Sequence, residues 1–398
     1  MRRAGAWGTI AAATAGAVVG AAVMLAVPLS GVPSEPGSRV TSPPPKVVGE
    51  APVRTLLAWS PSGLPPGYAG AVRGLPSVRR AAEVYSGFAW LTGWRGPSGP
   101  GRTPPRGLAV PVEVAAVDVA EYRAFLPPAD RSALAGLADG GALLGRTGAD
   151  LRRVGPGGTL TFGRVTLRVR GILEDQLIGA HEVLVSRATG TRLGIVRSRY
   201  LLVAPRTSAT RRRVEAGLRG TLPPGIRLRV RAPGETPVFR HGDAVLPSLA
   251  LKETFGEFAA APIEGGFLRI EDRWVTRNIR TARVPRLGTV RCHRRILPML
   301  RDALQELVDR GLAGLVDPAQ YGGCFSPRFL NRNPAAGLSH HAWGVAIDIN
   351  VAQNPYGAEP RMDRRVVEVF ERWGFTWGGR WLVPDAMHFE FMRFPARG

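Results

Sequence analysis

The chain has 398 residues, of which 44% are hydrophobic, so it is long enough to bury a sizeable core in each of two modest domains. Its formal net charge is +22, from 53 basic and 31 acidic side chains, and only Lys46 and Lys252 are lysines. A simple preference for arginine over lysine is excluded as the whole explanation, because it leaves the shortage of acidic residues unexplained. Such a charge attracts polyanions, a class that includes nucleic acid, anionic lipid headgroups and phosphate-rich wall polymers.

The positive charge is concentrated in the middle of the chain. Residues 51–250 hold 28 basic and 13 acidic side chains, whereas residues 251–398 hold 21 basic and 16 acidic side chains. The basic surface is therefore predicted to belong mainly to the middle segment.

The N-terminus predicts export. After Arg2 and Arg3, residues 4–29 carry no charge, and this run is long enough to span a bilayer. Basic residues ahead of the run predict a cytoplasmic start with the rest of the chain outside. We expect residues 1–30 to remain as a single-pass anchor in the cell membrane, because no clean Ala-x-Ala site ends the run; a cleaved signal peptide and a secreted protein are the alternative. Export in either form argues against nucleic acid as a partner.

Two further segments follow before the C-terminal part. Residues 31–52 are dense in Pro, Ser and Gly and predict an extended linker. Residues 53–245 predict a basic α+β domain outside the cytoplasm, with one solvated, arginine-lined sheet face. Its clearest elements are the strands 165–169 and 226–230 and the helices 131–137 and 211–218. The pattern is loosely similar to the extracytoplasmic domains of ABC permeases, although no motif in it is specific.

Residues 246–398 are predicted to form the last domain. Apolar residues recur at helical spacing from Ile296 to Val308, which predicts an amphipathic helix that ends near Gly311. A second helix is expected from Asp363 to Arg372. Its inward side chains are Val366, Val367 and Phe370.

The first half of a candidate metal site lies in the run SHHAWGVAIDIN. Residues 345–350 alternate like a strand, so Asp348 leaves the sheet on its less apolar face. His341 lies seven residues earlier, an odd offset that requires the chain to bend, and Gly344 permits such a bend. The neighbouring His340 should face the other way, as a surface or supporting residue.

The second half lies in the run PDAMHFEF. Phe389 and Phe391 alternate with His388 and Glu390, which predicts a buried strand with His388 facing the metal and Glu390 supporting it. Asp385 precedes His388 by three residues, at the mouth of this strand. Two imidazoles and one carboxylate leave zinc an open position for water, and a second carboxylate beside it can accept the proton of that water.

These two runs carry a resemblance to a known family. They read Ser339-x-His341-x-x-Gly344-x-Ala346-x-Asp348 and Asp385-x-x-His388-Phe389-Glu390. The pattern resembles the zinc D-alanyl-D-alanine carboxypeptidase and L-alanyl-D-glutamate endopeptidase family, which cleaves the stem peptides of peptidoglycan, and it covers the C-terminal third of the chain.

The resemblance implies an α+β peptidase domain with a small antiparallel sheet flanked by helices. It implies that zinc is the cofactor, bound by His341, Asp348 and His388. It also implies that Asp385 is the general base and that Arg328 contacts the substrate. Many members carry Glu at the position of Asp385, so the shorter acid looks like the endolysin-type branch. The resemblance therefore does not decide which peptide bond is cut.

The sequence therefore predicts a membrane-tethered zinc peptidase that acts on peptidoglycan stem peptides, held near anionic wall polymer or lipid by its basic middle domain. A non-catalytic wall-binding or sensor protein with the same fold is the alternative. The presence of Asp385 argues against it, because a purely structural zinc site closes its fourth position with a protein ligand and needs no base.

Three smaller expectations complete the interpretation. Cys292 and Cys324, the only cysteines, are expected to form a disulfide after export; metal binding is the alternative, but neither has a paired ligand spacing. Near the metal strand, Phe375 is expected in the core. For Trp377 and Trp381 two interpretations stay open: each belongs to the core, or each forms part of an aromatic wall for the substrate. Residues 354–356 are expected to form a loop at the rim of the cleft.

Overall fold

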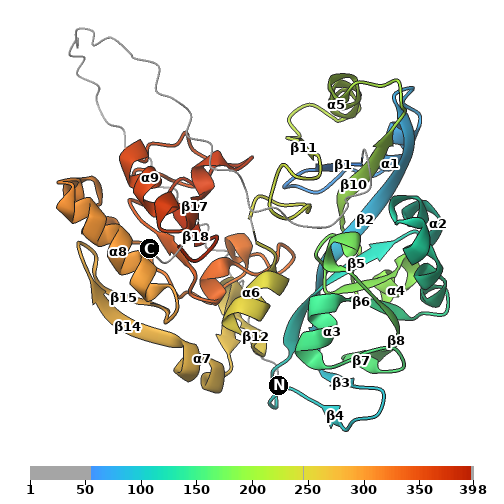
Figure 1. The fold of residues 1–398 in the computed structure, drawn as a ribbon, viewed down its shortest axis with the longest axis horizontal. Coiled ribbons are helices and arrows are strands. Elements are labelled where there is room, and N and C mark those ends of the chain that lie inside the picture. Colours follow the sequence, from blue (N-terminus) through green and yellow to red (C-terminus); the bar gives the residue numbers. More distant parts are fainter. Residues whose placement is uncertain (1–54, 245, 396–398) are drawn as a thin grey trace, which may run out of the picture. The chain divides into compact units, whose positions relative to one another are not determined.

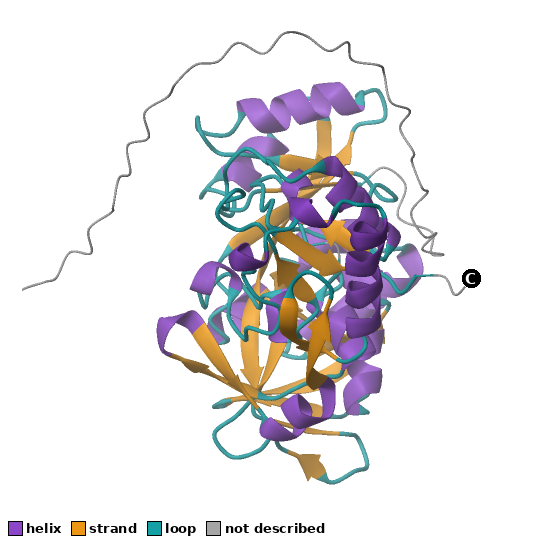
Figure 2. Ribbon diagram, turned by 90° about the vertical axis from the view of Figure 1, so that its left-hand side faces the viewer, coloured by secondary structure: helices purple, strands orange, loops and turns teal. Residues whose placement is uncertain are grey.

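Residues 55–244 and 246–395 are described by a computed structural model in which helices and strands are interspersed (Figures 1 and 2). This mixed content agrees with the predicted fold class. The predicted membrane segment, residues 1–30, and the linker, residues 31–52, lie outside the described residues. Within the described part, no helix has the length and apolar character needed to cross a bilayer.

An eleven-stranded sheet dominates the first part of the described chain, which we call the sheet part, residues 55–244. In spatial order its strands are β11 (Arg229–Arg231), β1 (Leu56–Trp59), β10 (Ser198–Pro205), β2 (Val78–Leu91), β5 (Val110–Val117), β9 (Val183–Ser186), β6 (Ala142–Gly145), β8 (Val165–Leu173), β7 (Thr159–Phe162), β3 (Gly93–Arg95) and β4 (Gly101–Arg102). The neighbours β5 and β9, and β6 and β8, are parallel, and the other pairs are antiparallel.

Short helices connect these strands. They are α1 (Tyr68–Arg73), α2 (Val119–Tyr122), α3 (Arg146–Arg152), α4 (Arg187–Arg192) and α5 (Arg211–Gly220). The predicted helix 211–218 is confirmed by α5, and the segment 131–137 lies inside a 3-10 helix, Pro128–Leu137. The predicted strand 165–169 is confirmed by β8, where Leu167 and Val169 are buried and Arg168 is exposed.

The predicted strand 226–230 is mostly wrong. Only its last two residues belong to β11, because the chain ahead of them turns and the amide of Ile226 bonds to the carbonyl of Pro223 at 3.4 Å. An amide used in a turn cannot also join the sheet ladder.

The second part runs from residue 246 to residue 395, and we call it the peptidase part after the family that the sequence resembles. Its elements are α6 (Ser248–Phe255), β12 (Ala260–Ile263), β13 (Phe267–Ile270), α7 (Asp272–Asn278), β14 (Ile279–Val284), β15 (Gly288–His293), α8 (Leu297–Asp309), β16 (Ala346–Asp348), α9 (Arg364–Arg372), β17 (Phe375–Trp377) and β18 (His388–Phe391). The strands β16, β18 and β17 form a three-stranded antiparallel sheet, and two hairpins, β12 with β13 and β14 with β15, accompany it. The small antiparallel sheet agrees with the predicted fold.

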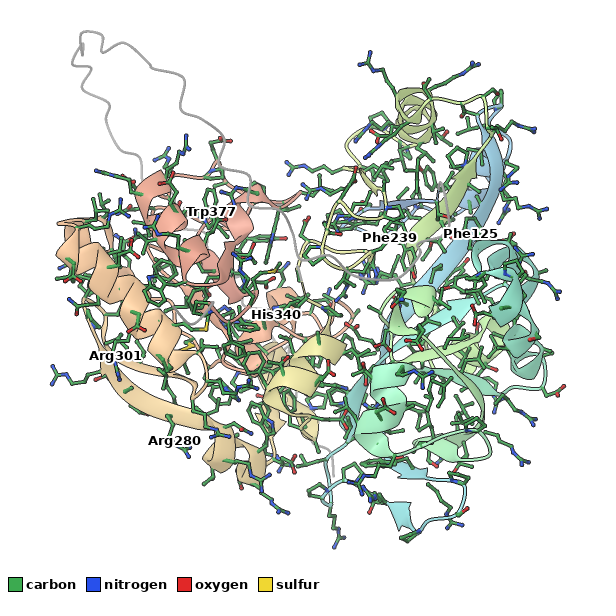
Figure 3. All side chains as sticks on the ribbon, viewed as in Figure 1. Phe125, Phe239, Arg280, Arg301, His340 and Trp377 are labelled. Carbon is green, nitrogen blue, oxygen red and sulfur yellow. A yellow bond between two sulfur atoms is a disulfide. The ribbon has the colours of Figure 1, made fainter. Side chains whose placement is uncertain are left out.

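Both predicted helices of the peptidase part are present. On α8 the side chains of Leu300 and Leu304 are fully buried, while Arg301 is exposed on the outer side of the helix (Figure 3). The α9 helix begins after Asp363, whose carboxylate accepts a hydrogen bond from the amide of Arg365 and so caps the helix. As predicted, the inward residues of α9 are buried: Val366, Val367 and Phe370.

The two parts share a hydrogen-bonded junction. The amide of Ala109, next to β5, bonds to the carbonyl of Ala260 in β12 at 3.0 Å, and the reverse bond measures 2.8 Å. Nearby, the ring of Phe329 meets the ring of Trp90 edge to face, with centroids 6.4 Å apart. Backbone pairing and aromatic packing therefore join β12 and its neighbours to the large sheet.

A buried cluster of charges lies at the same junction. Glu182, which is fully buried in the sheet part, accepts hydrogen bonds from Arg152 and from the Lys252 ammonium of α6, the latter at 2.8 and 2.9 Å. Glu257 pairs with both cations. Burial alone would raise the pKa of Glu182, but the charges of Lys252 and Arg152 outweigh it and hold this pKa below its usual value. Two acids thus neutralise two cations away from water.

We expect Glu182→Gln to lower the free energy of unfolding by about 3–5 kcal/mol, because it leaves two buried cations with one carboxylate fewer. Urea denaturation of the full chain measures this change. Glu174→Gln is the matched control: Glu174 pairs with Arg146 at 2.8 Å, but both side chains are half exposed, so its loss should change stability little. Equally small changes in the two variants would contradict a structural role for the buried cluster.

Candidate active site

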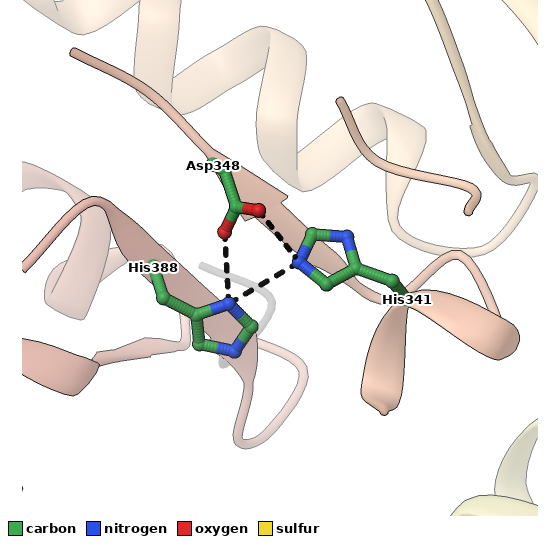
Figure 4. Close-up of side chains that lie close together, drawn as sticks. All are labelled: His341, Asp348 and His388. Atoms are coloured by element: carbon green, nitrogen blue, oxygen red, sulfur yellow. Dashed lines mark hydrogen bonds and ion pairs between the residues drawn. The ribbon is translucent and has the colours of Figure 1, made fainter. Parts of the chain in front are cut away.

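The structure brings His341, Asp348 and His388 together at one point (Figure 4). The Nε2 atom of His341 lies 3.1 Å from Asp348 Oδ2 and 3.2 Å from His388 Nδ1. Asp348 Oδ1 lies 2.9 Å from His388 Nδ1. All three side chains are buried. Three side chains from positions up to 47 residues apart in the chain therefore converge.

Strand pairing accounts for two of the three positions. Asp348 in β16 and His388 in β18 are direct partners in the antiparallel register, so their side chains lie next to each other on one face of the sheet. His341 arrives from a 3-10 turn, His340–Ala342. The predicted bend follows at Gly344, which has a φ of +66°, and a Cβ atom there would lie 3.0 Å from the amide nitrogen of His293. A side chain at this position would be strained and crowded.

The backbone sets the orientation of His341. Its Nδ1–H donates to the carbonyl of Cys324 at 2.8 Å, since a carbonyl oxygen can only accept. Burial lowers the pKa of His341, although Asp348 opposes the effect, and the Nε2 atom of the ring faces Asp348 and His388. Cys324 is held in turn by a disulfide to Cys292 at the end of β15, with an S–S distance of 2.18 Å, which confirms the predicted pairing. The disulfide thus fixes the segment that orients one candidate ligand.

Two buried residues support His388 from behind. Its Nε2 atom lies 3.3 Å from Glu390 Oε2, and the same carboxylate oxygen lies 2.8 Å from His340 Nδ1. His340 faces away from His341 as expected, but it is only 5% exposed, so the surface interpretation is wrong and the supporting one holds. A carboxylate behind a ligating imidazole fixes its ring orientation and raises its basicity.

The electrostatics of the site favour positive charge at its centre. Burial alone would lower the pKa of His388, but its hydrogen bonds to Asp348 and Glu390 and their negative charges outweigh burial and raise this pKa to about 10. Burial would likewise raise the pKa of Asp348, but His341 and His388 hold it well below its usual value. A buried carboxylate between two imidazoles is a site for a cation.

The geometry of this trio fits zinc. Zinc bound at about 2.0 Å in a tetrahedral site places its ligand atoms roughly 3.3 Å apart. The two imidazole nitrogens lie 3.2 Å apart, and each lies close to a different oxygen of Asp348: His341 Nε2 is 3.1 Å from Oδ2 and His388 Nδ1 is 2.9 Å from Oδ1. Two imidazole nitrogens and one carboxylate are also a donor set that zinc accepts with a fourth position left open.

Asp385 lies beside the trio. Its amide donates to the carbonyl of Gly378 at 3.0 Å, and its carbonyl accepts from the amide of His388 at 3.1 Å. A Cβ atom at Gly378 would lie 2.6 Å from the Asp385 carbonyl oxygen, so only glycine leaves room for this turn. The Oδ1 atom of Asp385 is buried, with no hydrogen-bond partner among the described residues. Burial raises the pKa of this carboxyl, and Asp348 adds to the increase, whereas His388 and Arg328 oppose it.

Arg328 also reaches the trio. Its Nη2 atom lies 3.2 Å from Asp348 Oδ2, and its carbonyl accepts a hydrogen bond from the amide of Ser339. The guanidinium is partly exposed, at 22%, and lines the same cleft as Asp385 and His388. A permanent cation with a fork of donors therefore stands next to the candidate metal ligands.

His341 and His388 line a cleft with a cavity of about 510 Å³, a volume that suits a small ligand. Trp381 lines it, with its ring centroid 5.2 Å from that of His388. Tyr356 also lines it, but Asn354 is fully buried and does not belong to the rim. Phe375 is core, as predicted. Trp377 packs against the core and donates its indole N–H to the carbonyl of Ala386, so it does not form a substrate wall.

The sequence reasoning missed one side of the cleft. Several lining residues come from the sheet part: Trp59, Phe88, Glu113, His181, Arg199, Arg240 and His241. None of them lies in a motif, and each is separated from His341 by about a hundred residues or more of intervening chain. Only the three-dimensional packing of the two parts brings them to the site.

Comparisons with known proteins agree with part of this description. A family model described as D-alanyl-D-alanine carboxypeptidase matches residues 332–391, a segment that holds His341, Asp348, Asp385 and His388. This match supports a peptidase of that family at the C-terminus. No curated protein sequence matches the chain.

Two solved structures show a remote likeness. One is the periplasmic region of MacB from Actinobacillus actinomycetemcomitans, 12% identical over 42% of this chain and 82% of that one, with a TM-score of 0.29. The other is the extracellular domain of the noncanonic ABC-type transporter YknZ from Gram-positive bacteria, 12% identical over 41% of this chain and 88% of that one, with a TM-score of 0.28. At these scores the likeness does not establish a shared fold.

Removing the support behind His388 should weaken metal binding. We expect Glu390→Gln to lower the affinity for zinc by about 10–100-fold, because the imidazole loses the carboxylate that orients it. Competition with a chromophoric chelator measures this affinity. Glu368→Gln on α9 is the control, since Glu368 is half exposed and forms a surface ion pair with Arg364, at 3.6 Å. Unchanged zinc affinity in Glu390→Gln would show that Glu390 does not support a ligand.

Proposed function

We propose that this chain is a zinc-dependent peptidase that hydrolyses peptide bonds in the stem peptides of peptidoglycan, tethered to the membrane with its catalytic part outside the cytoplasm. The observation that carries the proposal is the convergence of His341, Asp348 and His388 in a cleft that also holds Asp385. The family match over residues 332–391 supports the reaction class.

The metal and the protein would divide the chemistry. His341 Nε2, a carboxylate oxygen of Asp348 and His388 Nδ1 would hold zinc. Bound there, zinc supplies Lewis acidity and lowers the pKa of a coordinated water. Cys324 and Glu390 orient the two imidazoles, which keeps the ligand atoms in place before the ion arrives.

Asp385 would be the general base. Its buried Oδ1 atom has no hydrogen-bond partner among the described residues, and the side chain lines the cleft next to the candidate ligands. In this role it accepts a proton from the attacking water and returns it to the amine that leaves. Arg328 would bind either a carboxylate of the peptide or the oxyanion that develops on the scissile carbonyl.

The basic surface of residues 53–245 would hold the enzyme near anionic wall polymer or lipid headgroups. The excess of arginine over acid in this segment supports the proposal. Binding of the full chain to purified cell walls should weaken steeply as the salt concentration rises. Binding that does not depend on the salt concentration would contradict an electrostatic role for this basic surface.

The assigned base can be separated from the ligands by mutation. We expect Asp385→Asn to keep zinc but to lose about 10²–10⁴-fold in turnover of defined stem peptides, read by mass spectrometry. His341→Ala and His388→Ala should lose both zinc and turnover, since each removes a ligand. Full activity in Asp385→Asn would refute the base, and bound zinc without turnover in the wild-type chain would favour a binding or sensor protein.

Removal of the metal gives an independent test. Dialysis of the full chain against a chelator should abolish hydrolysis, and added zinc should restore it, because the ligand atoms are held by the protein without the ion. The measurement is the rate of stem-peptide cleavage before and after each step. Undiminished cleavage after complete removal of metal would overturn the proposed reaction.

A further inference from the structure

The cleft has two walls of different origin. One wall holds the candidate catalytic groups of the peptidase part, and the other belongs to the sheet part and includes Arg199 on β10 and Arg240 in the chain after β11. Arg199 also reaches across, since its Nη2 donates to the carbonyl of Ala335 in the peptidase part. A ligand that enters the cleft therefore meets residues of both parts.

Arg199 differs from the other arginines of the cleft. Arg328 lies against Asp348, Arg240 against Glu113 at 3.7 Å, and Arg332 over the ring of Phe267. Among the described residues, no carboxylate and no aromatic ring contacts the guanidinium of Arg199. Its Nε and Nη2 atoms donate to backbone carbonyls, the former to Ser86 at 3.4 Å, and for its Nη1 atom no acceptor lies among the described residues.

The surroundings supply negative charge to Arg199 only in part. Burial lowers the pKa of Arg199 to about 10, the charge of Arg197 adds to this effect, and the charge of Glu113 opposes it only in part. The nearby imidazoles of His181 and His241 are neutral, because burial lowers the pKa of both. The remaining acid on this wall, Glu113, also accepts a hydrogen bond from Ser248 at 3.0 Å.

The second acid near this wall is already engaged. Asp243 pairs with Arg229 at 2.9 Å and with Arg231 at 3.7 Å, and it accepts a hydrogen bond from the amide of Leu382. Among the described residues, the wall thus keeps a guanidinium that pairs directly with no carboxylate, in a partly enclosed cavity. An isolated charge taken from water is costly unless a counter-charge arrives, and here a ligand can bring it.

We propose that Arg199, with Arg240 on the same wall, forms an anion subsite that binds a carboxylate of the peptide substrate at a position separate from Arg328. The subsite rests on the proposed peptidase function, because it names the substrate feature that the sheet part recognises. A guanidinium can bind a carboxylate through two parallel charge-assisted hydrogen bonds, which are roughly twice as strong as neutral ones.

A peptide carboxylate suits this subsite better than a phosphate polymer. The guanidinium lines the same cavity of about 510 Å³ as Asp385 and His388, so the anion must belong to a molecule that also reaches the catalytic groups. A cavity of this size holds a short peptide. In a stem peptide the γ-linked D-glutamate keeps a free α-carboxylate in addition to the carboxylate at the C-terminus, which gives one anion for Arg199 and one for Arg328.

The test compares two stem pentapeptides, one with the α-carboxylate of its D-glutamate free and one with that group converted to an amide. With the full zinc-loaded chain, we expect Arg199→Gln to lower kcat/KM for the carboxylate peptide by about 10–100-fold, the usual effect of losing a charged hydrogen bond. Cleavage of the amide peptide should not change. Arg199→Lys should recover part of the loss, since it keeps the charge without the fork.

Arg197→Gln is the matched control. Arg197 lies near Arg199 and donates to the carbonyl of Ser62 at 3.1 Å, but it does not line the cleft, so neither peptide should be affected. If wild-type enzyme cleaves both peptides equally well, or if Arg199→Gln slows both equally, the subsite is overturned. An equal loss on both peptides would mean that Arg199 only holds the segment around Ala335.

A binding measurement keeps this proposal separate from the proposed function. If wild-type protein cleaves neither peptide, the peptidase proposal fails, and calorimetric binding of the two peptides to Asp385→Asn protein then decides the subsite. Tighter binding of the carboxylate peptide that disappears in Asp385→Asn/Arg199→Gln protein supports it. Equal binding, or binding of neither peptide, overturns it.

A glycerol phosphate oligomer tests the other source of the anion. If this oligomer binds in an Arg199-dependent way while the two peptides bind equally, the subsite is overturned and the anion is assigned to a wall polymer.

Discussion

The pairing of β16 with β18 is the constraint on which the candidate active site depends. It sets Asp348 directly opposite His388, and the chain before β16 then has to bend at Gly344 to bring in His341. A shift of one residue in this register would turn Asp348 to the other face of the sheet and separate the two side chains. The register is protected by the core, because Ile347 and Phe389, the neighbouring pair, are both fully buried.

Around this pairing the protein holds each imidazole by its second nitrogen. His341 is fixed by a backbone carbonyl and His388 by a carboxylate, and both supports are buried. The carbonyl belongs to a residue anchored covalently to β15, and the carboxylate is itself in contact with His340. The ligand atoms are therefore ordered by the fold, so binding an ion should require little rearrangement.

The sequence could predict these groups because their signals are local. Alternation over a few residues placed Asp348 and His388 on the polar side of their strands, and the helical spacing on α8 and α9 was equally clear. The position of His340 was harder. The side chain of His340 is expected to point away from that of His341, because the two residues are adjacent. Only the fold shows that it then meets Glu390 and not water. Arg199 had no signal at all, since it is one arginine among many on an ordinary strand, and its role depends on which surface lies against β10.

The buried lysine of α6 has a consequence for how the peptidase part can be studied alone. Lys252 belongs to that part by sequence, yet its ammonium pairs with Glu182 across the junction. The same ammonium donates a hydrogen bond to the carbonyl of Pro111 in the sheet part. A fragment that begins at residue 246 would leave this lysine with Glu257 but without Glu182, expose the apolar surface that β12 shares with the large sheet, and lack one wall of the cleft. Binding or cleavage measured on such a fragment would therefore report on a cleft that lacks the residues of the sheet part.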